Sequence, residues 1–106
     1  MNKPIRDPNR CPTHPGKFLR EISFPALGLP KTRIAAHLGI SRQTLHDLLT
    51  EKQPVTPQMA VRLGKLLGNN PQVWLNMQSA HDLWHASRKV NVSAIPTLKE
   101  KEEAPA

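Results

Sequence analysis

The chain has 106 residues, of which 38% are hydrophobic and only 4% aromatic. This length suits one domain with a small core, and the low aromatic content argues against a deep aromatic-lined substrate pocket. Fifteen Lys and Arg residues face eight Asp and Glu, a net charge of +7 that points to nucleic acid or an anionic membrane surface as partner. The single cysteine, Cys11, excludes an internal disulfide and a four-cysteine zinc site.

Charge and proline content divide the chain into three parts. Residues 1–12 hold three prolines and a net charge of +2, and we predict a flexible N-terminal arm. Residues 13–90 carry ten Lys and Arg against four Asp and Glu, so most of the basic excess falls on the predicted folded domain. Residues 91–106 have little apolar content and are predicted to form a disordered tail.

No segment predicts export or membrane insertion. No run approaches the ~18 apolar residues of a membrane span. The basic residues near Met1 are not followed by the apolar stretch of a signal peptide. A single cysteine also fits a reducing compartment. We therefore expect a cytoplasmic protein without a membrane partner.

Helix-start and helix-end residues predict an all-α fold of five short helices, over about 15–24, 31–38, 41–50, 56–67 and 70–89. Ser41, Thr56 and Asn70 are capping residues, and two of them precede a proline suited to the first helical turn. Gly39 and Gly68 suit helix ends with a left-handed backbone. The short connections between these segments indicate a compact domain.

Apolar residues fall on one side of each predicted helix. In the first helix Phe18, Leu19 and Ile22 form the apolar stripe, and Pro25 is expected to end the helix. The other positions predicted to face inward are Ile34, Ala35, Leu38, Leu45, Leu48, Leu49, Met59, Ala60, Leu63, Leu66, Leu67, Val73, Trp74, Met77, Ala80 and Trp84.

The second and third predicted helices carry the features of a helix-turn-helix. Ala35 is small enough for the next helix to cross closely, and Gly39 supplies the turn. Ile40 places one apolar side chain under the turn, and Ser41 caps the following helix. An ordinary helical hairpin without DNA contacts is the alternative, and the basic charge of residues 13–90 favours the DNA-binding interpretation.

A recognition helix beginning after Ser41 would lie in the major groove with its N-terminal residues on base edges. Arg42 can form two hydrogen bonds to guanine O6 and N7. Gln43 can form two hydrogen bonds to adenine N6 and N7. The predicted base-contacting residues are the outward ones, Arg42, Gln43, Thr44, His46 and Asp47. For Asp47, cytosine N4, a pair with Arg42 and plain solvation all stay open. The predicted phosphate-contacting residues are Lys31, Arg33, Ser41 and Lys52.

Blocks spread over residues 14–86 carry a family resemblance. They are His14-Pro15-Gly16 with Phe18-Leu19-Arg20-Glu21; Leu27-Gly28-Leu29; Ile34-Ala35 with Leu38-Gly39-Ile40-Ser41-Arg42; Pro54-Val55-Thr56-Pro57 with Met59-Ala60, Arg62-Leu63 and Leu67-Gly68; and Trp74-Leu75-Asn76-Met77-Gln78 with Asp82-Leu83-Trp84. In these blocks the chain resembles a HigA-type antitoxin of the Xre helix-turn-helix superfamily, from bacterial toxin–antitoxin modules.

The resemblance implies a lambda-repressor-like domain of about five helices that forms a homodimer. It also implies repression of the module's own operon through a palindromic operator in double-stranded DNA, and neutralisation of a cognate RelE-like mRNA-cleaving toxin. Relatives often have Gln where Lys31 stands, and Asn-Gly where Thr50-Glu51 follows the recognition helix. The late apolar residues of the last helix make it the expected dimer element.

The segment from His81 to His85 is similar to the zinc-protease pattern H-E-x-x-H, because histidines at i and i+4 share a helical face. Asp82 replaces the glutamate base, and no later histidine could act as a third ligand. Cys11 is expected to be a spare thiol. We therefore predict no catalytic residue, no metal, no cofactor and no enzyme activity.

Three other functions compete with the antitoxin. A stand-alone Xre-family repressor would bind DNA without a toxin partner. A protein-only adapter would use the same helices without DNA, and a zinc hydrolase would use the histidine pair. A toxin-like reading frame beside the gene separates the antitoxin from the repressor, and steep salt dependence of DNA binding separates both from the adapter.

Overall fold

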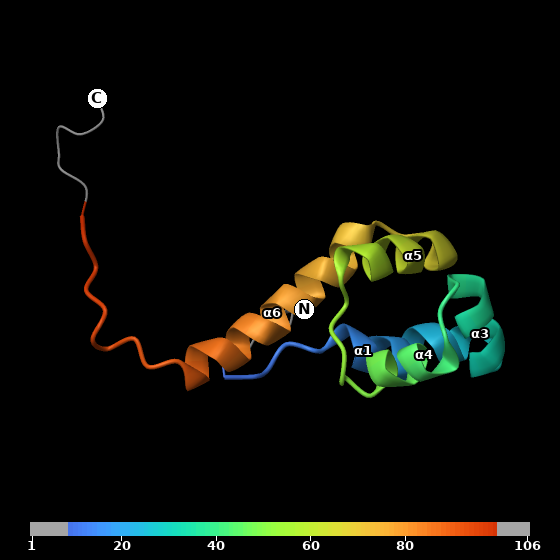
Figure 1. Ribbon diagram of the computed structural model, residues 1–106, viewed down its shortest axis with the longest axis horizontal. Coiled ribbons are helices and arrows are strands. Elements are labelled where there is room, and N and C mark those ends of the chain that lie inside the picture. The colour runs from blue at the N-terminus through green and yellow to red at the C-terminus, as the bar shows by residue number, and fades with distance from the viewer. Residues whose placement is uncertain (1–8, 100–106) are drawn as a thin grey trace, which may run out of the picture.

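The computed structural model describes residues 9–99, and this part of the chain is helical without strands (Figure 1). The elements are α1 (Pro15–Phe18), η1 (Leu19–Ser23), α2 (Phe24–Leu27), α3 (Lys31–Leu38), α4 (Arg42–Leu49), α5 (Pro57–Leu67) and α6 (Pro71–Lys89). The first three run on without a break, so the described residues form five helical segments, and the predicted all-α class is confirmed.

The predicted caps fix the helix starts. Ser41, Thr56 and Asn70 each accept a backbone N–H of their own helix, at α4, α5 and α6. At α1 the cap is His14, whose Nδ1 accepts the Gly16 N–H at 2.8 Å. His14 is buried, and burial lowers its pKa, which favours the neutral ring that this acceptor role requires.

The first helix differs from the prediction after Phe18. Pro25 does not end it: the backbone widens into the π-helical turn η1, continues through α2 and ends at Gly28, whose φ is +68°. A π turn accommodates the proline, because no i→i−4 bond is needed from its nitrogen. The wider turn also shifts the register. Ile22 is 56% exposed, and Phe24, five residues after Leu19, is buried in its place.

The core lies between the first helical segment (α1, η1 and α2) and the helices α3, α4, α5 and α6. In α4 the three predicted inward leucines are all buried, as are Ala60 and Leu63 of α5. Val73 of α6 is 44% exposed, so its predicted inward position is wrong. The inward face of α6 instead carries Trp74 and, four residues on, the polar Gln78. Figure 1 shows α6 as the long helix that crosses from α5 past α1.

Gln78 joins three parts of the fold. Its Oε1 accepts the N–H of the buried Val55 at 2.7 Å, and its Nε2 donates to Asp82 Oδ1 at 3.0 Å. The same Nε2 lies 3.3 Å from His14 Nε2. This one amide therefore satisfies the loop before α5 and links it to α6; it only packs against His14, because His14 Nε2 carries the ring proton when Nδ1 accepts.

Replacing Gln78 by leucine should destabilise the domain by about 1–3 kcal/mol, because the buried Val55 N–H would lose its partner. Gln72 is the matched control: it is exposed on the same helix, and its side-chain amide donates to Asn76 Oδ1, another exposed group. Gln72→Leu should stay within about 0.5 kcal/mol of the parent. Urea denaturation measures both, and equal midpoints for Q78L and the parent would refute the assigned role.

The ends of the described chain lie outside the helical core. Residues 91–99 carry no helix and are exposed, and residues 9–13 lead into α1. Residues 1–8 and 100–106 fall outside the described residues, so the predicted arm, domain limits and tail stay predictions. Between residues 9 and 99, no helix is both long and apolar enough to cross a membrane.

Candidate nucleic-acid interface

The turn between α3 and α4 has the geometry expected of a helix-turn-helix. Gly39 ends α3 with φ +72°, and the Ile40 N–H donates to the Ala35 carbonyl at 3.0 Å. Ile40 is half-buried and packs against the core. Ser41 Oγ accepts the Thr44 N–H at 3.0 Å and donates to Thr44 Oγ1 at 2.9 Å. The start of α4 is thus rigidly defined.

The face of α4 opposite its leucines is open to solvent. Arg42, Gln43 and His46 are exposed, whereas Thr44 and Asp47 are half-buried. Because the first backbone N–H groups of a helix lack intrahelical partners, this end of α4 also presents positive dipole charge. The five predicted base-contacting residues therefore sit on one helix with its first turn accessible; their contacts with bases stay predictions.

Asp47 is held by Gln43. Gln43 Nε2 donates to Asp47 Oδ1 at 2.8 Å, one helical turn along α4. Within residues 9–99 no ion pair joins Asp47 to Arg42. The Asp47 carboxylate thereby orients the Gln43 amide. It forms no ion pair with the Arg42 guanidinium.

The predicted phosphate-contacting residues lie around this face. Lys31 begins α3 and Arg33 lies in its first turn, and both are exposed. Ser41 is exposed, although its hydroxyl is already used in capping, so the amides beside it are the more available donors. Lys52 is exposed just after α4.

Two arginines to which the sequence patterns gave no individual role hold the motif in place. Arg62 of α5 donates from Nη1 to the Leu38 carbonyl at 2.7 Å and so caps the end of α3. The same Nη1 would lie 2.8 Å from a Cβ at Gly39, so a larger residue would push the Arg62 side chain aside, whereas the φ of +72° is what calls for glycine. Arg20 donates from Nη1 to the Leu49 carbonyl at 2.6 Å, at the end of α4.

The loop after α4 takes a left-handed backbone without glycine. Glu51 has φ +65°, which costs a non-glycine residue about 1–2 kcal/mol. The Lys52 N–H donates to the Asp47 carbonyl at 2.8 Å, and Glu51 Oε2 lies 3.9 Å from Arg20 Nη1. The arginine draws this carboxylate toward η1.

The fold and the exposed α4 define a helix-turn-helix protein. No family model matches the chain. It is 37% identical to the HTH-type transcriptional regulator YddM of Escherichia coli over 84 residues, which cover 79% of this chain and 88% of YddM. It is 30% identical to antitoxin HigA-1 of Vibrio cholerae, with 85% of each chain covered. The solved structure of antitoxin GraA in complex with its operator superposes with TM-score 0.73 and 31% identity, over 95% of this chain and 97% of GraA.

The chain belongs to the HigA-type antitoxin family of Xre helix-turn-helix proteins. The coverage is nearly complete on both sides, so the likeness includes the whole domain and not only the two motif helices. The relatives just named are transcriptional regulators and antitoxins.

Proposed function

We propose that this protein binds the operator of its own transcription unit through α4 and neutralises a toxin encoded beside it. The observation that carries the DNA-binding part is the free first turn of α4, where Arg42 and Gln43 are exposed beside the Ser41 cap. The net charge of +7 supports an anionic partner. The GraA structure was solved with its operator and a Pseudomonas aeruginosa HigA with the higBA promoter, which favours DNA as that partner.

We further propose a homodimer that reads a palindrome. Two copies of α4 spaced by about 34 Å, one turn of DNA, would enter successive major grooves. The outer face of α6 is a candidate dimer surface, because Leu83 is 67% exposed there. Arg42 and Gln43 would read bases, with Thr44, His46 and Asp47 beside them, and Lys31, Arg33, Ser41 and Lys52 would contact phosphates.

The DNA-binding proposal is tested by titrating a fragment of the chain's own promoter at several salt concentrations. Three of the four residues proposed to touch phosphates are cations, so a dimer would neutralise about six phosphates, and the log–log slope should be about −5. A scrambled fragment of equal length is the control. Absence of a complex at low ionic strength would contradict the proposal and favour the protein-only adapter.

The toxin part is tested by co-expression with the product of the adjacent gene. A stable complex, and relief of mRNA cleavage and growth arrest by this chain, would support an antitoxin of a RelE-like toxin. Operator binding with no toxin complex would instead support the second candidate, a stand-alone repressor, which the likeness to the regulator YddM favours.

A further inference from the structure

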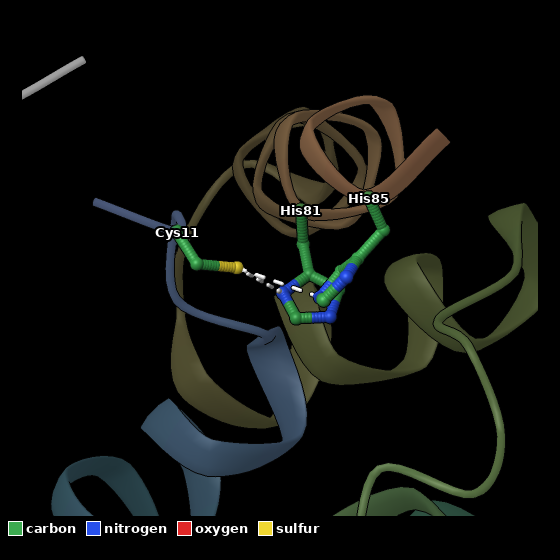
Figure 2. A group of neighbouring side chains, drawn as sticks. All are labelled: Cys11, His81 and His85. Carbon is green, nitrogen blue, oxygen red and sulfur yellow. Dashed lines mark hydrogen bonds between the residues drawn. The ribbon is translucent and has the colours of Figure 1, made fainter. Parts of the chain in front are cut away.

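Three metal-ligating side chains converge where the segment before α1 crosses α6. Cys11 Sγ lies 3.6 Å from His81 Nδ1 and 3.5 Å from His85 Nε2. These three ligand atoms all lie within 4.8 Å of one another. Figure 2 shows both imidazole rings projecting from one face of α6 toward the cysteine sulfur. The sequence offers no later histidine as a third ligand for His81 and His85; the candidate third ligand is a cysteine that lies 70 residues earlier in the chain.

Specific contacts hold the cysteine at this place. The Pro12 carbonyl lies 2.9 Å from His81 Nδ1, which fixes the residue after Cys11 on α6. Two residues further on, the ring of His14 packs edge-on against the ring of His81, with centroids 4.9 Å apart. The position of Cys11 is thus set by neighbours that are themselves anchored on the core.

The two sulfur-to-nitrogen distances agree with tetrahedral coordination, and the two histidine nitrogens, which lie within 4.8 Å of each other, would have to be about 3.4 Å apart around a bound ion. Zinc lies about 2.3 Å from a cysteine sulfur and about 2.0–2.1 Å from a histidine nitrogen, so a tetrahedral angle places S and N about 3.6 Å apart. The observed separations of 3.6 and 3.5 Å match this value. A donor set of one thiolate and two imidazoles binds zinc in preference to magnesium or calcium.

We propose that Cys11, His81 and His85 bind one Zn²⁺ ion, with water as the fourth ligand. His85 is exposed and the other two ligands are half-buried, so the fourth position faces solvent. On binding, the Cys11 thiol loses its proton to solvent and the ring proton of His81 moves from Nδ1 to Nε2, so the zinc link replaces the hydrogen bond from His81 Nδ1 to the Pro12 carbonyl. Asp82 is already engaged by Gln78, and no general base is assigned to the water.

The zinc site would link two distant segments of the chain, and we call this link the clamp. The ion would tie residues 9–14, which precede α1 and include its cap, to the second half of α6. Because a bound ion stabilises the folded chain and not the unfolded one, its effect should grow with the concentration of free metal.

The test uses the full chain with Co²⁺ as spectroscopic probe and Zn²⁺ as competitor. We expect one Co²⁺ per chain, visible bands of tetrahedral cobalt, and a near-ultraviolet thiolate-to-cobalt band that Zn²⁺ abolishes. Cys11→Ser should remove the thiolate band and weaken the binding of Zn²⁺ at least tenfold. His85→Gln should weaken the binding of Zn²⁺ by a similar factor. Both replaced residues lie outside the core, so the variants should fold. His37→Gln is the matched control: His37 is exposed on α3, and the variant should bind Zn²⁺ like the parent.

Two further readouts separate the clamp from adventitious binding to the histidine pair. Zn²⁺ should raise the melting temperature of the parent and not of C11S. It should also slow alkylation of Cys11, which is directly reported because the chain has no other cysteine. Equal Zn²⁺ affinity in C11S and the parent, or alkylation that Zn²⁺ does not slow, would overturn the proposal.

Discussion

Replacing Gly16 by alanine is expected to destabilise the domain by about 3 kcal/mol or more, the upper end of the range for overpacking. Gly16 is buried in α1, where α1 packs on the end of α4. An added Cβ would overlap the Leu48 carbonyl oxygen and would also lie 3.1 Å from His14 Nδ1. The carbonyl belongs to the α4 backbone, so the clash cannot be relieved by a side-chain rotation.

The sign of this effect distinguishes packing from helix propensity. Alanine is favoured over glycine in a helix by about 1 kcal/mol, so propensity alone predicts a more stable protein. Lys17→Ala is the control, because Lys17 is exposed on the same short helix and its replacement adds no atom near α4. Thermal denaturation measures both variants. For a domain of this size, about 3 kcal/mol corresponds to a fall of roughly 12–24 °C in Tm; a rise would refute the assigned contact.

Gly16→Ala should also affect DNA binding, because the added Cβ would displace α4. Since α1 supports α4, the proposed recognition helix, folded G16A should also bind the proposed operator more weakly than the parent. Binding is measured well below the melting temperature, with the folded fraction checked by circular dichroism. Full operator affinity in a destabilised G16A would show that α4 keeps its position and that the clash is absorbed elsewhere.

Features of the fold that depend on neighbouring residues could be predicted from the sequence. Ser41, Thr56 and Asn70 start their helices by bonding to N–H groups two or three residues ahead, and Gly39 ends α3 through its own φ. The exposure of Gln43 follows equally locally, since it lies on the side of α4 opposite Leu45 and Leu48; Arg42, three residues before Leu45, is exposed because it begins the helix.

Features that depend on distant contacts could not be predicted this way. Gln78 looks like a surface residue until its partner Val55 is known, 23 positions away. The bond from Arg62 to the Leu38 carbonyl joins two helices, and Cys11 meets His81 only because the segment before α1 returns along α6. The register error at Ile22 has a different cause, because a helical period of 3.6 does not anticipate a π turn before a proline.

The largest effect on function is expected at Arg42, and it rests on the proposed DNA binding. Arg42→Ala should weaken operator binding by about 1–3 kcal/mol, roughly 5- to 150-fold, and relax the preference at one base pair of each half-site. The guanidinium is exposed on the first turn of α4 and forms no ion pair with Asp47, so little intramolecular interaction has to be broken before it can grip a guanine.

Arg42→Lys separates charge from recognition. Lysine keeps the positive charge but lacks the planar fork that matches guanine O6 and N7. We therefore expect R42K to bind a scrambled fragment as the parent does, with an unchanged salt slope, and yet to lose preference for the operator. Lys52→Ala should do the opposite. It should weaken binding to both fragments alike and make the log–log salt slope shallower by about 0.9 for each phosphate that the variant no longer neutralises.

Lys89→Ala is the control for removal of one charge away from α4. Lys89 ends α6, which projects away from α3 and α4 (Figure 1). Its replacement should leave both affinity and base preference close to those of the parent. Competition titrations with operators carrying each single base-pair change measure these preferences. If R42A and R42K keep the parent's preference at every position, Arg42 does not read a base, and recognition must begin further along α4, at Gln43, Thr44 or His46.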